Sequence, residues 1–288
     1  MKRLTTILGV LLGVQLVLAL ALGLAGRDFG PAGAGEPLLS FEQDQIVRIR
    51  IAAPDQEELV LEKTEDRWLL PALQGFPAAA FKVEGLLDKL SGLRKRLPVA
   101  TTEAAARRFK VADQEFERKL TLETEAGEPA VLFLGDSPGF RRLFARTQDD
   151  SAIYEAELAL FDAASKADDW TDKTYLHLKE ADVERIELPD TVLERKDGEW
   201  TLADLAEGEA SAAGEVSAAA RKISNLNFSS VSGVAEPHSE PVYSLKVVLA
   251  EGDPIEYRLY ELTEGTDYGL KSTAHPLSLI HISEPTRH

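Results

Sequence analysis

An internal duplication constrains the fold more than any other feature of this chain. Residues 58–70 (ELVLEKTEDRWLL) and 190–202 (DTVLERKDGEWTL) align without a gap, 132 positions apart. In this alignment Trp68 is equivalent to Trp200. Each tryptophan follows a turn sequence and begins a short apolar run. Repetition at a fixed spacing is typical of a structural unit that is used more than once. We therefore expect two copies of one module.

Three further blocks repeat in the same order: 45–51 with 182–188, 83–93 with 216–226, and 126–134 with 251–259. The first block alternates apolar and polar residues, as a half-buried strand does. The apolar residues of the second recur at helical spacing on one face. Asp197-Gly198 in the second copy is a strong hairpin signal. Each copy is predicted to run β-β-β-α-β-β with further strands, which makes an α+β fold of mainly antiparallel sheet.

The duplication also divides the chain. The first α+β repeat is predicted over 40–160 and the second over 178–276. The residues between them, 161–177, are predicted to form a connecting helix or an ordered linker. The second copy stops where the first has residues 153–160, so we expect it to be truncated.

The N-terminal segment, residues 4–24, is almost wholly apolar. About 21 residues span roughly 30 Å as a helix, which matches the hydrocarbon core of a bilayer. Lys2 and Arg3 precede it, so residues 1–27 are predicted to be a cytoplasmic tip and a single-pass anchor in the inner membrane, with the rest in the periplasm. A cleaved signal peptide is the alternative, because small residues at 19–25 offer a cleavage site. Both interpretations place the remainder outside the cytoplasm.

The C-terminal segment, residues 277–288 (LSLIHISEPTRH), resembles the translation of a transposase-based sequencing adapter. We interpret it as an artefact that is not part of the natural fold. His281 and His288 then carry no meaning as ligands or bases. The natural chain is expected to continue past Pro276 with other residues.

Composition excludes several partners and chemistries. The chain has 49 acidic and 32 basic residues, for a formal net charge of −17. Such a surface repels phosphate backbones and anionic lipid headgroups, so nucleic acid is not an expected partner. The absence of cysteine excludes disulfides, thiolate metal sites and a lipoprotein anchor.

A search for chemistry finds no nucleophile elbow, phosphate loop, dinucleotide fingerprint or HExxH motif. The acidic run 168–172 could offer calcium ligands, but it lacks the Gly and the terminal Glu of an EF-hand loop. Helix N-capping by Asp168, Asp169 or Thr171 is the preferred interpretation. His177 is expected to be packed or on the surface, and His238 lies in a polar loop.

Trp68 and Trp200 could stack on a ligand, but core residues of a duplicated hairpin are the preferred interpretation. We therefore expect no catalytic, cofactor-binding or metal-binding residues, and no cofactor.

Several of these features together resemble one family, over nearly all of residues 1–276. They are the basic, apolar N-terminus, the strand QIVRIRI, the LxLEK…W motif, the leucine-bearing helix, the tripeptide LGD and the segment DDWTDKTYLHL. The chain resembles domain of unknown function family 4340. The resemblance implies a membrane-anchored bacterial protein, often encoded beside ABC-type transporter genes, and implies no catalytic residues.

Three functional hypotheses follow. The first is a non-catalytic, membrane-anchored extracytoplasmic accessory or scaffold component of an ABC-type transport system, with the permease and associated envelope proteins as partners. The second is a module that binds an envelope polymer or ligand. The third, ranked last, is a carboxylate-dependent hydrolase.

Overall fold

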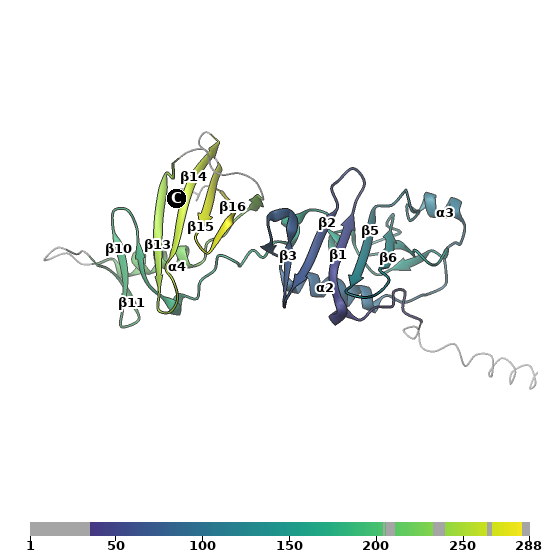
Figure 1. The fold of residues 1–288 in the computed structure, drawn as a ribbon, viewed down its shortest axis with the longest axis horizontal. Coiled ribbons are helices and arrows are strands. Elements are labelled where there is room, and N and C mark those ends of the chain that lie inside the picture. Colours follow the sequence, from purple (N-terminus) through teal and green to yellow (C-terminus); the bar gives the residue numbers. More distant parts are fainter. Residues whose placement is uncertain (1–34, 204, 206–210, 233–239, 264–266, 284–288) are drawn as a thin grey trace, which may run out of the picture.

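The computed structural model describes residues 35–203, 205, 211–232, 240–263 and 267–283. The predicted anchor at 1–27 lies outside these residues. Within the described part of the chain, no helix has both the length and the apolar character needed to cross a bilayer. Two β-rich modules follow one another along the long axis of the molecule (Figure 1).

The first module is an eight-stranded antiparallel sheet with the order β4-β3-β2-β1-β5-β6-β7-β8. Its strands are β1 (Ile46–Ala52), β2 (Leu59–Thr64), β3 (Arg67–Leu70), β4 (Phe76–Pro77), β5 (Arg118–Thr124), β6 (Ala130–Leu134), β7 (Leu143–Thr147) and β8 (Tyr154–Ala156). Its helices are α2 (Ala80–Gly92) and α3 (Glu103–Arg108), with short 3-10 turns η2 (Gln43–Gln45) and η3 (Pro71–Leu73).

The second module is also an eight-stranded antiparallel sheet, with the order β11-β10-β9-β13-β14-β15-β16-β12. Its elements are η6 (Glu180–Asp182), β9 (Val183–Glu187), β10 (Val192–Lys196), β11 (Glu199–Leu202), α4 (Ala213–Ser224), β12 (Ser230–Ser232), β13 (Tyr243–Leu249), β14 (Ile255–Thr263), β15 (Asp267–Ser272) and β16 (His275–Ser283). The order β3-β2-β1-β5-β6-β7-β8 of the first sheet recurs as β11-β10-β9-β13-β14-β15-β16. The prediction of two mainly antiparallel α+β modules, each with a helix, is confirmed.

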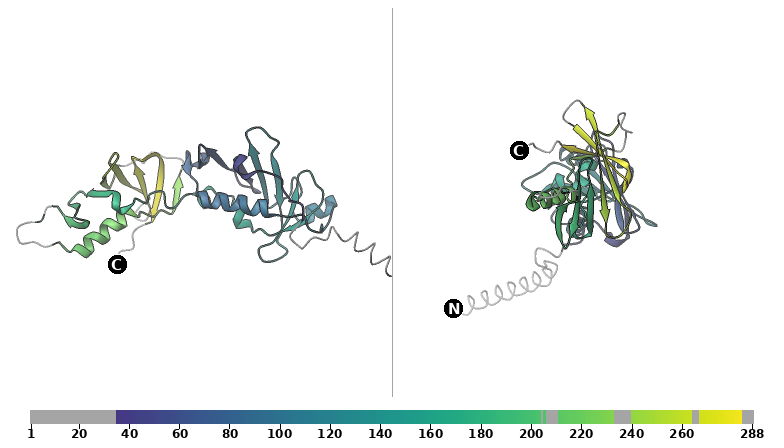
Figure 2. Two further views of the ribbon diagram at one scale, coloured as in Figure 1. Left: turned by 90° about the horizontal axis from the view of Figure 1, so that it is seen from below. Right: turned by 90° about the vertical axis from the view of Figure 1, so that its left-hand side faces the viewer.

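Alternation along β1 sets the two faces of the first sheet. Ile49 and Ile51 are buried on the face that α2 covers, while Arg48 and Arg50 are exposed on the other face. Helix α2 lies along the sheet (Figure 2). Its buried side chains are Val83, Leu86, Leu87 and Leu90. Each fully buried aliphatic side chain contributes about 1.5–3 kcal/mol of transfer free energy.

The predicted hairpins are present in both copies. Asp197 and Gly198 both have positive φ angles, 52° and 87°, as the two-residue turn between β10 and β11 requires. In the first copy, Glu65 takes a φ of 55° between β2 and β3. The tryptophans that follow these turns, Trp68 and Trp200, are buried, so their interpretation as core residues is confirmed.

Helix α3 is an addition to the first module that the duplication does not predict. The hydroxyl of Thr102 accepts a hydrogen bond from the amide of Ala105 at 3.3 Å and caps the helix. Ala106 and Val111 pack with Phe133 of β6 in a separate small core. The segment around α3 therefore covers the part of the sheet that α2 leaves open. In the second module, α4 leads to β12 without such a helix.

The linker is ordered, and its helical content is limited to the 3-10 turns η4 (Leu160–Ala163) and η5 (Ala167–Trp170). Trp170 is buried, and its indole NH donates to the carbonyl of Ala164 at 2.8 Å. The N-cap of η5 is Lys166, without a side-chain cap, so the predicted N-capping by Asp168, Asp169 or Thr171 is wrong. Asp168 lies within the turn. Its carboxylate instead accepts the amide of Val231 at 3.0 Å, at the start of β12, 63 residues away.

An aromatic cluster fills the junction between the modules. The buried ring of Phe76 meets Tyr175 of the linker at 5.0 Å and Phe228 of the second module at 5.7 Å, both edge-on. The ammonium of Lys173 lies 4.6 Å from the centre of the Phe228 ring and donates to the carbonyl of Ser229 at 2.7 Å. One buried apolar cluster thus continues from the first sheet through the linker into the second.

Strand β16 takes the place in the second sheet that β8 has in the first. It pairs with β15 and β12, and Ile280 is fully buried. From residue 277 onward, its residues belong to the segment interpreted as an adapter translation. Both this interpretation and the predicted truncation stay predictions, since an alternating apolar run pairs with an open sheet edge whatever its origin.

Replacement of Phe76 by Ala should destabilise the protein by about 3–5 kcal/mol, because the cavity opens where both modules meet the linker. We expect one cooperative unfolding transition to separate into two and trypsin to cleave within 161–177. Calorimetry and limited proteolysis would measure this. Phe140→Ala is the control, because this side chain is 89% exposed and its loss should change stability by less than about 0.5 kcal/mol. A single unshifted transition in Phe76→Ala would contradict the prediction.

Mass spectrometry of the chromosomally encoded protein should yield no peptide that contains residues 277–288. The adapter interpretation implies that this segment is not part of the gene, so we expect a different sequence after Pro276. Recovery of the peptide LSLIHISEPTR from that protein would show that the adapter interpretation is wrong.

Candidate functional site

The residues singled out from the sequence do not come together in space. The carboxylate of Asp168 accepts a hydrogen bond from the amide of Val231 in β12. The carboxylate of Asp172 accepts hydrogen bonds from the amide and the hydroxyl of Thr174 at 2.9 and 2.7 Å. His177 is exposed, with Nε2 3.4 Å from the amide oxygen of Asn227. His238 lies outside the described residues. In the described ranges, no three His, Asp or Glu side chains are grouped so as to hold a metal ion.

A cleft of about 710 Å³ lies in the first module between α2 and the linker turns η4 and η5. Its apolar lining includes Leu86, Leu160 and Trp170. Phe81 and Phe161, which are 70% and 69% exposed, also line it. Two large aromatic side chains that remain this exposed beside a concavity are characteristic of a binding surface.

Charged side chains around the cleft tie its walls together. Nζ of Lys89 lies 2.5 Å from a carboxylate oxygen of Asp162, and the ammonium of Lys82 donates to the carbonyl of Asp169 at 2.5 Å. Both contacts join α2 to the linker. The cleft is lined by four cationic side chains and two carboxylates: Lys82, Lys89, Arg118 and Lys166, with Asp162 and Asp169. The cleft is therefore locally basic in an acidic chain.

The chemistry available in the cleft favours binding. Its hydroxyl group, on Ser165, donates to the amide oxygen of Gln56 at 2.7 Å, and an amide is not a general base. The guanidinium of Arg118 donates to the carbonyl of Ala163 at 3.1 Å and stabilises the wall. What the cleft presents to a ligand is aromatic surface with ammonium groups beside it, which suits apolar groups and carboxylates.

The cleft was not predicted from the sequence, although the sequence holds one signal for it. Phe81 falls outside the spacing of the buried positions of α2, which begin at Val83. A large aromatic residue on the polar face of an amphipathic helix is an exception that points to a binding surface. Phe161 gave no such signal because it lies in a 3-10 turn without periodicity.

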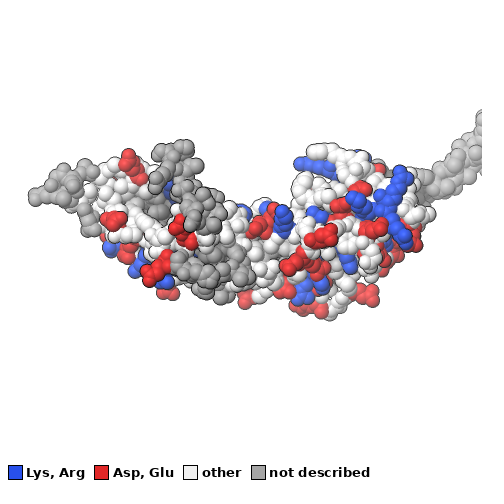
Figure 3. Space-filling view, turned by 90° about the horizontal axis from the view of Figure 1, so that it is seen from above, with Lys and Arg blue, Asp and Glu red and all other residues white. Residues whose placement is uncertain are grey.

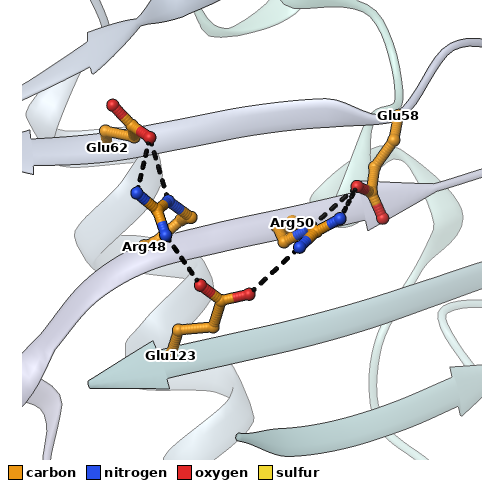
Figure 4. Close-up of polar contacts among 5 residues, drawn as sticks. All are labelled: Arg48, Arg50, Glu58, Glu62 and Glu123. Carbon is orange, nitrogen blue, oxygen red and sulfur yellow. Dashed lines mark hydrogen bonds and ion pairs between the residues drawn. The ribbon is translucent and has the colours of Figure 1, made fainter. Parts of the chain in front are cut away.

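The open face of the first sheet carries a network of ion pairs (Figure 4). Arg48 contacts Glu62 at 2.8 Å and Glu123 at 3.0 Å, and Arg50 contacts Glu58 at 2.5 Å and Glu123 at 3.4 Å. Hydrogen bonds to Glu123 and Glu62 raise the pKa of Arg48, and those to Glu58 raise the pKa of Arg50. Such exposed pairs are screened by solvent and contribute little net stability.

One of these pairs is duplicated. Arg185 and Glu194 are directly opposite across β9 and β10, as Arg48 and Glu62 are across β1 and β2, and their charged atoms are 3.7 Å apart. The pair therefore favours the same strand register in both copies. This repetition identifies it as a structural feature of the module.

Asp150 organises the turn between β7 and β8. Its carboxylate accepts the amide of Ala152 at 2.9 Å and the hydroxyl of Tyr154 at 3.2 Å, and Lys95 lies 3.4 Å away. These groups favour the ionised form, and the hydrogen bond from Ala152 is the largest cause that lowers the pKa of Asp150. Residues 149–150 therefore lie in the connection between β7 and β8.

Comparison with known proteins gives one match. A family model described as a domain of unknown function (DUF4340) matches residues 68–246, which is more than half of the chain. The match extends from β3 through the linker to β13 and so includes parts of both modules. No curated protein and no solved structure matches the chain.

Asp150→Asn should lower the free energy of unfolding at pH 7 by about 1 kcal/mol, because it removes a charged hydrogen-bond acceptor. A carboxylate with a lowered folded-state pKa stabilises the protein above its unfolded pKa of about 3.9, and that contribution disappears as the pH falls through the folded value. The difference between variant and native protein should therefore shrink between pH 5 and about pH 3 in urea titrations. Asp149→Asn, at the exposed neighbouring position, is the control; a difference for Asp150→Asn that is constant across this range would contradict the assignment.

Proposed function

The chain belongs to the DUF4340 family, and from this premise we propose that it is a non-catalytic, membrane-anchored extracytoplasmic accessory component of an ABC-type transport system. In this role it docks a segment of a partner protein in the cleft beside α2. The observation that carries the proposal is the pair Phe81 and Phe161, exposed on a cleft of about 710 Å³ with basic walls.

The occupant is an extended polypeptide segment with large apolar side chains and nearby carboxylates. Aromatic residues on a concave surface contribute much of the binding free energy at protein interfaces. Lys166 is exposed and makes no ion pair within the described part of the chain, so it is free to meet a carboxylate. An acidic segment is attracted here although it is repelled by the chain as a whole, whose formal charge is −17.

The cleft is formed before any partner binds. One wall is α2, held on the sheet by its buried leucines, and the other is the linker, held by buried Trp170 and by the contacts of Lys82 and Lys89. A site that is rigid in the free protein loses less conformational entropy on binding. This suits a scaffold that recruits a partner without changing shape.

The second candidate is a module that binds an envelope polymer or small ligand. The cleft volume favours it, because ligand sites commonly enclose about 300–1,000 Å³. The two candidates predict different occupants of one site and can be separated by the same variant.

The double variant Phe81→Ala/Phe161→Ala should reduce copurification of an ABC-type permease and its ATPase by about tenfold, since it removes both aromatic anchors. The measurement is quantitative copurification of full-length chain from detergent-solubilised membranes. Val242→Ala is the matched control, because this side chain is 54% exposed in the second module. A photoreactive residue at position 161 should crosslink to the transporter.

Equal copurification with the double variant and the native protein, both folded, would contradict the docking proposal. If an envelope glycan or peptide raises the melting temperature of the native chain but not of the double variant, and the transporter does not copurify, the ligand-binding candidate replaces it.

A further inference from the structure

The described chain enters the first module at the end that is remote from the second module. Residues 36–38 run antiparallel to the segment that follows α2. The amide of Leu38 donates to the carbonyl of Leu93 at 3.0 Å, and the amide of Lys95 donates to the carbonyl of Glu36 at 2.8 Å. Helix α2 begins next to the linker, because Ala79 hydrogen-bonds Trp170. Its C-terminus therefore points toward the outer end of the first module, where Figure 1 places α3.

This outer end carries exposed apolar side chains among arginines. Leu97 is 90% exposed and Phe140 is 89% exposed. A shallow pocket of about 330 Å³ brings residues 96–99 beside Arg142, which ends the turn that bears Phe140. We define the outer-end patch as Arg96, Leu97, Val99, Phe140, Arg141 and Arg142; the carboxylates of Glu155 and Glu157 line the same pocket.

The turn that bears Phe140 is well defined by local contacts. The hydroxyl of Ser137 lies 2.7 Å from the carbonyl of Gly139 and 2.8 Å from that of Arg142, close enough to donate to either. The guanidinium of Arg141 lies 5.3 Å from the centre of the Phe140 ring. These contacts hold the ring on the outside of the turn, where it makes no contact with the core.

The charge of this end differs from that of the whole chain. Arg94, Lys95 and the three patch arginines, five basic side chains, are opposed by four carboxylates: Glu36, Asp150, Glu155 and Glu157. Arg96 pairs with Glu157 at 2.9 Å and Arg142 with Glu155 at 3.3 Å. Arg141 makes no ion pair with any described residue. Basic side chains gather at the outer end of the first module in Figure 3. A local positive excess with protruding apolar groups is the chemistry that binds an anionic lipid surface.

We propose that the outer-end patch rests on the membrane, with Leu97 and Phe140 inserted among the headgroups and the arginines on lipid phosphates. This inference rests on the membrane anchor of the proposed function. The predicted anchor ends at residue 27, so the eight residues to position 35 reach at most about 28 Å. The patch stands at the end of the molecule from which that segment departs, and the second module then projects away from the bilayer.

The test uses the full-length chain, which has no cysteine, so that single cysteines can carry a fluorophore. Probes replace Leu97, Phe140 or, as the reference, Phe81, which is 70% exposed at the opposite end of α2. The chain is added to phosphatidylcholine vesicles with or without phosphatidylglycerol, and lipids that bear a quencher report contact. Carbonate washing at high pH separately reports whether the chain is anchored.

Quenching at 97 and 140 should exceed that at 81 by about threefold in anionic vesicles. Arg96→Glu/Arg141→Glu should abolish the excess, while Arg221→Glu/Arg258→Glu, an equal charge change at exposed positions of the second module, should not. An anchored chain with equal quenching at all three positions overturns the patch and leaves the proposed function standing. A chain that carbonate removes, but that binds anionic vesicles through these arginines, supports the patch and overturns the anchor. A chain that carbonate removes and that does not bind anionic vesicles overturns both the patch and the anchor.

Discussion

Burial of the linker between the two modules is the interaction on which the remaining architecture depends. Its backbone bonds to the first module through Trp170, whose carbonyl accepts the amide of Ala79 at 2.7 Å. At its other end, His177 forms an isolated bridge with Asn225 of the second module, and the next residue, Leu178, donates to the carbonyl of Ser224 at 2.7 Å. The ring of Phe76 contacts aromatic residues from both sides of this junction. Because the linker also forms one wall of the cleft beside α2, the same packing that joins the modules creates the candidate binding site. Loss of the junction would therefore alter the site without touching its exposed phenylalanines.

The two copies share a topology but have diverged in what covers their sheets. Leu86 and Leu87 of α2 correspond to Ala219 and Ala220 of α4, so the second helix buries less apolar volume. The first module adds α3 on its other face. Duplication followed by such divergence leaves one module to carry the cleft and the outer-end patch. The other retains the shared sheet and its paired charges.

Electrostatics in this protein is local. A formal charge of −17 describes the chain as a whole and argues against nucleic acid. It does not describe the cleft, which cationic side chains line, or the outer end, where arginines lie beside Leu97 and Phe140. At physiological ionic strength the screening length is about 8 Å, so a partner at either surface responds to the nearby charges more than to the total.

The sequence by itself determined the two α+β modules, their hairpins and the amphipathic helix of each, because these follow from local periodicity and from turn chemistry such as Asp197-Gly198. Only the tertiary structure decided the positions of α3 and β4, the role of Asp168 and the surfaces proposed for binding. Asp168 failed as a predicted N-cap because its partner, Val231, comes from the other module. Phe81 was signalled by its position off the apolar face of α2, but Phe140 and Phe161 read as ordinary hydrophobic residues in the sequence. Whether such a side chain is buried or exposed depends on which distant segment packs over it, and no local pattern contains that information.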